Sequence, residues 1–459
     1  MSKDIVLFDN RINCCGCWAC SNICPNGAIT MQTDKQGFYF PQINNEKCVK
    51  CGLCLKTCPI KKRDSEINVE MQRPHIRIVN YGTANNFGAV LTAICLEKTV
   101  RSIVPDDYIV QTIDYDANGE MWNKRTKRRK KISANFELFS LLLERLHLKR
   151  HTENPDYIPA HNGSQLRTHR YNKFRNRFLN FTSKTDNYAL DNIKVNDAAL
   201  ICGSDVIWFP PRVDLRSSKG FYLDFGSEKA KRIAYAASLD SEVNAELLKK
   251  KSAYRKHLKK FDYISVRESA NIDFIQSVTD KKVCKIVDPV FLYKPEDFDE
   301  MLSLSDEKMP DEDYIYAYIL MNNDKAYEYT LKLAEEKNLK ICYFADFYSD
   351  FGENAVDCYD DGPAEFMQRI KNAKYIVTTS FHCIVFSLLF NKQFIAFDRG
   401  NNSIKIPDIL ETFGIPERLA KENNIIDIDS PIDFIETDKL IEKYRKDALD
   451  YLKKSIMTK

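Results

Sequence analysis

The chain has 459 residues, 44% of them hydrophobic and 29% charged, which suits a globular protein of two to four domains at roughly 100–200 residues per domain. Its 68 Lys and Arg residues nearly balance 65 Asp and Glu residues, and the net charge of +3 argues against a protein that coats nucleic acid. No stretch approaches the roughly 20 apolar residues of a membrane-spanning helix, and residues 1–10 show no signal-peptide pattern. We therefore expect a cytoplasmic protein whose 15 cysteines are reduced or bind metal.

Cysteine spacing at the N-terminus is the strongest chemical signal. Two runs fit the pattern C-x2-C-x2-C-x3-C-P, the first closed by Pro25 and the second by Pro59. In bacterial two-cluster ferredoxins, which residues 10–60 resemble, the fourth cysteine of each run ligates the cluster of the other run. The predicted ligands are therefore Cys14, Cys17, Cys20 and Cys58 for one [4Fe–4S] cluster, and Cys48, Cys51, Cys54 and Cys24 for the other.

The same cysteines leave alternatives open. Pairs with C-x2-C spacing also bind zinc, although two proline-closed runs of four cysteines favour iron–sulfur clusters. The clusters either transfer single electrons or serve only to hold together a domain that is too small to build a hydrophobic core. Cys15 falls outside the spacing and is not an expected ligand.

From residue 76 onward, short apolar runs alternate with amphipathic helices. In chain order, the predicted strands are 76–79, 108–113, 198–202, 232–237, 263–266, 283–287, 314–320, 340–344, 375–379 and 394–397. The predicted helices begin near Gly88, Asn244 and Glu268, and then span 325–336, 364–373, 382–390, 404–413 and 432–456. This alternation predicts an α/β fold of two Rossmann-like lobes with mostly parallel sheets. The expected limits are a ferredoxin-like domain over 1–63, a linker over 64–75, and lobes over 76–303 and 304–459.

Polar residues follow several predicted strands, at the carboxyl edge where open α/β sheets bind ligands. Asn86 and Gly88 open a helix whose N-terminal N–H groups suit an anion, although Asn86 can simply cap the helix. Ser204 and Asp205 follow the third strand, and they serve equally well as turn residues. We expect Asp205 to bind a hydroxyl group of a substrate, if this edge is a substrate site.

Two charged residues carry the catalytic prediction. Arg267 ends a strand beside Glu268, with a surface ion pair as the alternative. His382 begins a helix directly after the hydroxyls of residues 378–380, and a helix N-terminus lowers an imidazole pKa and favours bound anions. A packing role is the alternative for this histidine. Asp288, which precedes a proline, indicates a turn.

In their order along the chain, these motifs resemble the polysaccharide pyruvyl transferases. The matching segments are 86–91, 203–205 with Trp208, 232–238, 264–268, 288–289, Ala373 and 381–382. The resemblance implies a GT-B-like fold of two lobes. It also implies transfer of the enolpyruvyl part of phosphoenolpyruvate onto two sugar hydroxyls, which gives a cyclic ketal and phosphate. His382 matches the family's catalytic histidine, and Arg267 matches its arginine on the donor.

One position departs from the family pattern. Many members have Arg-Leu-His where this chain has Ser380, Phe381 and His382. The missing guanidinium would normally hold the donor's phosphate or carboxylate. Arg399 or Lys405 is the expected substitute, unless the donor differs.

The predicted function is therefore the addition of a pyruvyl ketal to a sugar of a surface polysaccharide or of its lipid-linked precursor. Two [4Fe–4S] clusters would form a fused module for electron transfer or for structure. Because ketal formation is redox-neutral, it does not use the clusters, and their electron partner is unknown. The alternatives are an iron–sulfur oxidoreductase of the coenzyme-F420 dehydrogenase β-subunit type and a non-catalytic electron-transfer partner in polysaccharide assembly. Absence of a G-x-G-x-x-G fingerprint argues against the first alternative.

A basic segment raises the question of membrane contact. Lys124–Lys131 is basic at every position except Thr126 and precedes an apolar-rich run over Phe136–Leu146. Such a segment can attach a protein at the inner face of the membrane to anionic lipid or to a lipid-diphosphate-linked glycan, at about 1 kcal/mol per basic residue. The alternative is a solvated loop before an ordinary packed helix.

Overall fold

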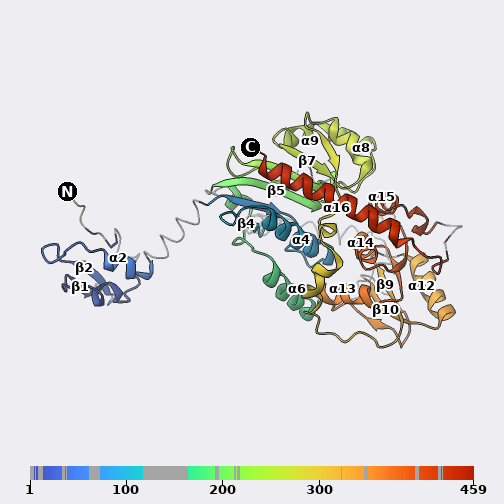
Figure 1. Cartoon of the computed structure of the whole chain (residues 1–459), viewed down its shortest axis with the longest axis horizontal. Helices are drawn as coiled ribbons and strands as arrows, with labels where there is room; N and C mark the ends of the chain where they lie inside the picture. Colours follow the sequence, from blue (N-terminus) through green and yellow to red (C-terminus); the bar gives the residue numbers. More distant parts are fainter. Residues whose placement is uncertain are drawn as a thin grey trace, which may run out of the picture. The chain divides into compact units, whose positions relative to one another are not determined.

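The computed structural model divides the chain into two compact units, Met1–Pro74 and His75–Lys459 (Figure 1). It describes residues 5, 7, 8 and 14–458, except 34–36, 38, 61–72, 117–163, 192–195, 211–212, 214–217, 322, 346–349, 399–402, 422–424 and 426. The basic segment 124–131, the run 136–146 and Arg399 therefore lie outside the described residues.

The smaller unit pairs two short helices with a two-stranded sheet. Its elements are α1 (Ala19–Asn22), β1 (Ile29–Thr33), β2 (Tyr39–Ile43) and α2 (Leu53–Thr57). β1 and β2 are antiparallel, with Ile29 opposite Ile43. The core cluster consists of Leu7, Cys20, Ile29 and Cys54, so two predicted cluster ligands supply half of it. A core of this size needs a further source of stability, which bound metal can provide.

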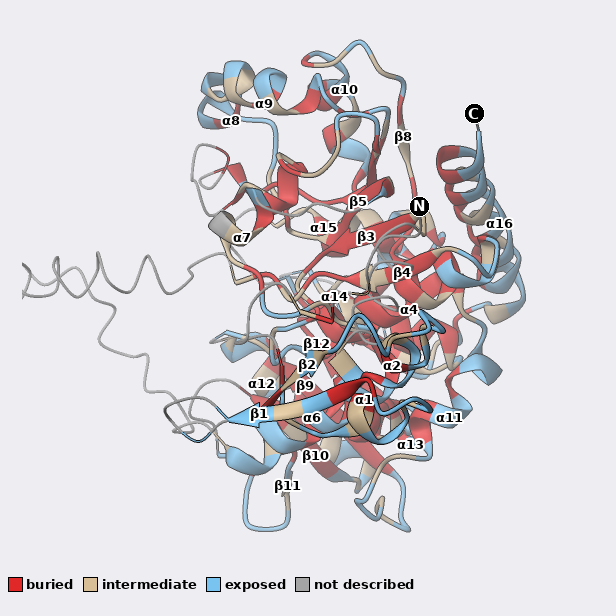
Figure 2. Cartoon of the chain, turned by 90° about the vertical axis from the view of Figure 1, so that its left-hand side faces the viewer, coloured by how far each residue is buried: buried red, intermediate tan, exposed pale blue. Residues whose placement is uncertain are grey.

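The first lobe of the larger unit is built on six parallel strands. They are β3 (His75–Val79), β4 (Ile109–Thr112), β5 (Asp197–Asp205), β6 (Lys231–Ala237), β7 (Tyr263–Val266) and β8 (Val283–Lys285). Their order in the sheet is β4-β3-β5-β6-β7-β8. All of β3 and most of β5 are buried, including the polar side chains of His75 and Arg77 (Figure 2), as strands of a parallel sheet covered by helices usually are.

The second lobe is built on five parallel strands. They are β9 (Tyr314–Ile319), β10 (Lys340–Ala345), β11 (Val356–Asp357), β12 (Tyr375–Thr378) and β13 (Gln393–Ala396), in the order β11-β10-β9-β12-β13. All four pairings are parallel, so the carboxyl ends of the strands lie at one edge.

Helices cover both sheets. The longer ones are α4 (Phe87–Ile103), α6 (Gln165–Phe178), α9 (Lys251–Leu258), α12 (Asp324–Lys337), α13 (Pro363–Asn372), α14 (Phe381–Leu389), α15 (Lys405–Thr412) and α16 (Phe434–Met457). A single buried cluster contains α4 and β3 side chains of the first lobe together with α13 and α14 side chains of the second. α16 reaches back to the first lobe, where the Tyr451 hydroxyl donates to the Ala234 carbonyl over 2.8 Å.

The predicted fold class is confirmed. Each strand predicted beyond residue 76 has a counterpart in the two parallel sheets, and the small cysteine-rich unit precedes them. Elements that were not predicted include α6, because Arg and Lys interrupt its apolar face, and β11, because it has only 2 residues. None of the described helices is long and apolar enough to cross a lipid bilayer.

Candidate functional site

Most of the residues proposed from the sequence line one cavity of about 110 Å³ in the larger unit. Its polar lining is Asn86, Gly88, Asp205, Arg267, Ser380, His382 and Lys405. Phe87, Tyr318, Leu320, Phe366 and Phe381 form the apolar part. These side chains come from the carboxyl ends of strands in both lobes and from the helices that follow, so the two sheet edges contribute to a single site.

Two helix N-termini meet at His382. Asn86 caps α4 by accepting from Ala89 N over 3.0 Å, and the Ser380 hydroxyl caps α14 by accepting from Cys383 N over 3.5 Å. Gly88 lies directly against the imidazole ring, because a Cβ atom at this position would overlap His382 Nδ1. The glycine therefore allows the close approach of α4 to the histidine.

The other ring nitrogen of His382 faces two polar side chains. Nε2 lies 3.1 Å from Thr92 Oγ1 and 3.5 Å from Asp288 Oδ2. Thr92 also donates to Asp288 Oδ1 over 3.1 Å. Burial opposes ionisation of this carboxyl, but the neighbouring His382 and Arg267 lower the pKa of Asp288 to about 2. Asp288 is therefore an anion in the core at neutral pH.

Arg267 is held by two carboxylates. Its Nε donates to Glu268 Oε1 over 3.0 Å and its NH1 donates to Asp288 Oδ2 over 3.1 Å. The guanidinium carbon lies 4.2 Å from the centre of the Phe381 ring. Burial disfavours the charged form, yet Glu268 and Asp288 raise the pKa of Arg267. For Glu268, burial raises the carboxyl pKa against the opposing effect of Arg267.

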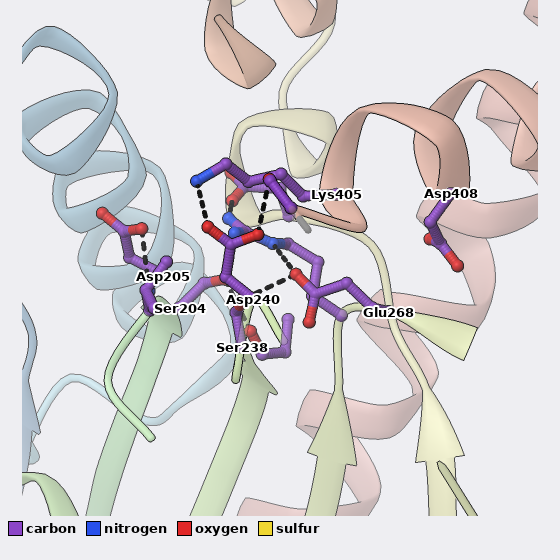
Figure 3. A network of polar contacts seen from close by, with 12 residues as sticks. Ser204, Asp205, Ser238, Asp240, Glu268, Lys405 and Asp408 are labelled. Carbon is purple, nitrogen blue, oxygen red and sulfur yellow. Dashed lines mark hydrogen bonds and ion pairs between the residues drawn. The ribbon is translucent and has the colours of Figure 1, made fainter. Parts of the chain in front are cut away.

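Lys405 brings a second cation to the cavity from the N-terminus of α15. Its Nζ donates to Asp240 Oδ2 over 2.7 Å, and Ser403 donates to the other oxygen of the same carboxylate over 2.7 Å. Figure 3 shows Lys405 reaching from its helix toward Asp240, above the ends of the first-lobe strands. Burial opposes ionisation of Asp240, but Lys405 lowers its pKa.

One proposed substrate residue, Ser204, is not part of this lining. Ser204 is fully buried, and its hydroxyl donates to the Ala236 carbonyl over 2.7 Å. Arg399 lies outside the described residues. Lys405, one of the two expected substitutes for the family arginine, lines the cavity.

Sequence reasoning missed three contributors to the site. Asp288 looked like a turn residue, and it does cap the short helix that follows by accepting from Val290 N over 3.1 Å. Thr92 lies inside an apolar helix, and Asp240 lies in a loop. The signal available for Asp288 was its position directly after a predicted strand, the same signal that marked Arg267.

In the smaller unit, the cysteines gather across the two runs. The thiol pKa of Cys20 is raised by burial and also by nearby Cys14 and Cys58. A separate cavity is lined by Cys24, Cys48, Cys51 and Cys54. Each group contains one cysteine from the other run, and the assignment of ligands to the two clusters stays a prediction. Among the described residues, no three Cys, His, Asp or Glu side chains gather as ligands of a single metal ion.

Comparison with known proteins agrees with both regions. The family model described as polysaccharide pyruvyl transferase matches residues 86–401, and the chain belongs to this family. A 4Fe-4S dicluster domain matches residues 13–62. The N-terminal region is also 32% identical over 59 residues to an uncharacterized ferredoxin of Methanocaldococcus jannaschii, covering 13% of this chain and 73% of the relative. The chain is therefore a polysaccharide-modifying transferase that carries an iron–sulfur module.

Solved structures that resemble the chain are distant. UDP-GlcNAc 2-epimerase from Neisseria meningitidis is 8% identical at a TM-score of 0.43, with 84% of this chain and 94% of that one covered. Heptosyltransferase II from E. coli is 10% identical at a TM-score of 0.29, with 80% and 99% covered. Likeness at this level does not indicate a ligand or a reaction.

Proposed function

We propose that this protein transfers the pyruvyl group of phosphoenolpyruvate onto two hydroxyls of a saccharide, forming a cyclic ketal and releasing phosphate. The observation that carries the proposal is the placement of His382 and Arg267 in one cavity, joined through a single carboxylate, Asp288. A proton-transfer group next to a cation is what this reaction needs. Membership of the pyruvyl transferase family supports a saccharide acceptor.

The reaction is balanced in protons. One acceptor hydroxyl adds to the enol carbon, and its proton goes to the methylene carbon, which becomes a methyl group. The second hydroxyl displaces phosphate from the same carbon, and its proton leaves with the phosphate. General acid–base groups contribute about 10²–10⁴-fold to such steps. His382 is the candidate for moving these protons.

The anionic donor needs positive charge and hydrogen-bond donors. Among the described residues, Arg267 and Lys405 are the cations of the cavity lining. Arg267 would stabilise charge that grows on the departing phosphate, and Lys405 would bind the anionic donor. Asn86 and Ser380 add an amide and a hydroxyl. Asp205 would bind an acceptor hydroxyl from the first-lobe side, because a carboxylate is a strong hydrogen-bond acceptor. The acceptor is a sugar of a surface polysaccharide or of its lipid-linked precursor.

The smaller unit would hold two [4Fe–4S] clusters. Cys14, Cys17, Cys20 and Cys58 would ligate one, and Cys24, Cys48, Cys51 and Cys54 the other. The cavity lined by the latter four cysteines supports this assignment. When bound, the clusters supply one-electron transfer, which the ketal chemistry does not use, so we assign them a structural role or an electron partner outside the transfer reaction.

One experiment tests the transfer reaction. Protein purified without oxygen is incubated with phosphoenolpyruvate and candidate saccharide acceptors, and phosphate release is followed together with the mass of the acceptor. The proposal expects phosphate release that depends on the acceptor, and an acceptor that gains the mass of one ketal-linked pyruvate. Release without a modified acceptor, or no release with any acceptor, would count against it.

A further inference from the structure

We propose that Asp288 is a positioning residue that, through Thr92, fixes the proton of neutral His382 on Nε2, so that Nδ1 is the nitrogen that transfers protons. This inference rests on the proposed transferase function, because it names the working atom of the same site. The inference adds to the proposed function a positioning role for Asp288 and Thr92, to which the sequence patterns assigned no function.

The assignment follows from counting hydrogens around Thr92. A threonine hydroxyl has one hydrogen, and an ionised carboxylate is an acceptor only. Because the Thr92 hydroxyl donates to Asp288 Oδ1 over 3.1 Å, it has no hydrogen left for the histidine. The 3.1 Å contact between Thr92 Oγ1 and His382 Nε2 is then a hydrogen bond only if Nε2 carries the proton.

The negative charge of Asp288 also favours a proton on Nε2 of His382. Its Oδ2 lies 3.5 Å from His382 Nε2 and stabilises an N–H group there rather than a lone pair. The carboxylate itself is fixed from other sides, since Arg267 NH1 donates to Oδ2 over 3.1 Å and Val290 N donates to Oδ1 over 3.1 Å. Its side chain is fully buried, so water does not compete for these contacts.

Nδ1 is left with its lone pair on the side of α4. Gly88 and His382 both line the cavity, and because Gly88 has no side chain, the start of α4 lies directly against Nδ1 without a clash. In neutral His382, Nδ1 takes a proton from an acceptor hydroxyl, and the resulting imidazolium returns it to the donor carbon or to the phosphate. Asp288 then stabilises the imidazolium without itself taking the proton, because its pKa is held low.

Asp288 also joins the proton-transfer group to the donor-binding cation. Arg267 contacts Asp288 with NH1 and Glu268 with Nε, and Glu268 in turn accepts from the Ser238 hydroxyl over 2.6 Å. Among the residues that the structure describes, Asp205 and Lys405 are the other charged groups that line the cavity. A change in the charge of Asp288 therefore acts on both His382 and Arg267.

The tautomer can be measured without any turnover. In the anaerobically purified full chain with ¹⁵N-labelled histidine, the His382 signals are identified by their loss in His382→Gln. We expect a protonated Nε2 and an unprotonated Nδ1 at a pH where the ring is neutral. Asp288→Asn should mix or invert the two tautomers. A wild-type protein with the proton on Nδ1 would overturn the inference, whether or not it transfers pyruvate.

Kinetics give the second readout. Asp288→Asn should lower kcat by at least about a hundredfold and shift the pH profile to lower pH, because the imidazolium loses its counter-charge. Thr92→Val should lower kcat less, and Thr92→Ser, which keeps the hydroxyl, should restore it. Asp361→Asn is the matched control, since Asp361 is another buried carboxylate that accepts from an arginine Nε over 3.1 Å but does not line the cavity; it should leave the pH profile unchanged.

These outcomes separate the two proposals. If wild-type protein shows the expected tautomer but releases no phosphate from phosphoenolpyruvate, the proposed function fails and the positioning of His382 by Asp288 stands. If wild-type protein is active and Asp288→Asn keeps kcat and its pH profile, the positioning role is wrong and the proposed function stands.

Discussion

The cysteine-rich unit and the two-lobed unit build their sites over very different distances along the chain. All the predicted cluster ligands lie within residues 14–58, and each group of four combines three cysteines of one run with one of the other. In the larger unit, Thr92 and His382 are 290 positions apart and meet only because the strands of both sheets end at the same cavity.

The difference teaches how chemistry is encoded in each unit. A cluster ligand is set by spacing, because a short turn is enough to aim neighbouring sulfurs at one point. A site at the carboxyl edge of parallel sheets is set by topology, because each strand end contributes one or two side chains. We therefore expect substitutions in the two units to have different consequences: loss of iron in the smaller unit and loss of turnover in the larger one.

The largest expected effect is on turnover. His382→Ala and Arg267→Lys should each lower phosphate release by at least about a hundredfold, with iron content and fold unchanged. Lysine keeps the charge but lacks the planar fork that contacts two carboxylates. Arg267→Ala should also reduce turnover, but it leaves Asp288 and Glu268 buried without their cation, at a cost of about 3–5 kcal/mol.

Normal turnover in both His382→Ala and Arg267→Lys would show that the cavity is not the catalytic site. Lys421→Gln is a suitable control, because Lys421 is an exposed cation of the second lobe and should not alter the rate. Circular dichroism and iron analysis on each variant separate loss of chemistry from loss of fold.

The second prediction concerns iron. Wild-type protein should contain about eight irons, and Cys24→Ala should lower this to about four by removing the cluster of Cys48, Cys51 and Cys54. Cys15→Ala is the matched control in the same segment and should keep all the iron. The measurements are iron per chain and the visible absorption of anaerobic preparations.

Double variants determine which cluster is lost. Cys24→Ala combined with Cys54→Ala should lose no more iron than either alone, because both act on one cluster. Cys24→Ala combined with Cys20→Ala should lose nearly all of it. The reverse result, with Cys20 and Cys24 acting on the same cluster, would mean that the ligands do not cross between the runs. Stoichiometric zinc in place of iron would contradict the cluster assignment altogether.

Sequence patterns were enough for most strands of the larger unit but not for all of the site. Apolar runs such as 263–266 predicted β7 to the residue, because buried parallel strands are short and continuous. Asp288 was missed because a carboxylate before a proline is adequately explained by a turn, and its contacts with Arg267 and His382 exist only in the folded chain. Thr92 gave no signal, because a single hydroxyl in an apolar helix often bonds to its own backbone.

The third prediction concerns stability against pH. The pKa of Asp288 is about 2 in the fold against 3.8 ordinarily, so the unfolded chain binds more protons between these values. Ionised Asp288 should therefore contribute on the order of 2 kcal/mol above pH 4, lost progressively as the pH falls toward 2. Urea unfolding across this range should show the slope in wild type and its loss in Asp288→Asn.

Asp361 should behave in the opposite sense. Burial raises its pKa to about 6 despite Arg369, so the folded chain binds more protons than the unfolded chain between about pH 4 and 6. Its contribution is favourable at low pH and is lost as the pH rises through 6. Asp361→Asn should remove that fall in stability and leave the acid slope of Asp288 in place. Equal slopes in both variants would mean that neither carboxyl is shifted as described.

The smallest expected effect is on donor affinity at Lys405. Lys405→Gln removes one cation from the cavity, and a charge-assisted hydrogen bond contributes about 1.5–3 kcal/mol. Because Asp240 already holds the ammonium group in the resting protein, part of that energy is offset when the group turns to the donor. We therefore expect KM for phosphoenolpyruvate to rise about tenfold with kcat little changed.

Ser403→Ala, which removes only the hydroxyl that donates to Asp240, should change KM less. An unchanged KM in Lys405→Gln would show that Lys405 serves to hold the two lobes together through Asp240 rather than to bind the donor.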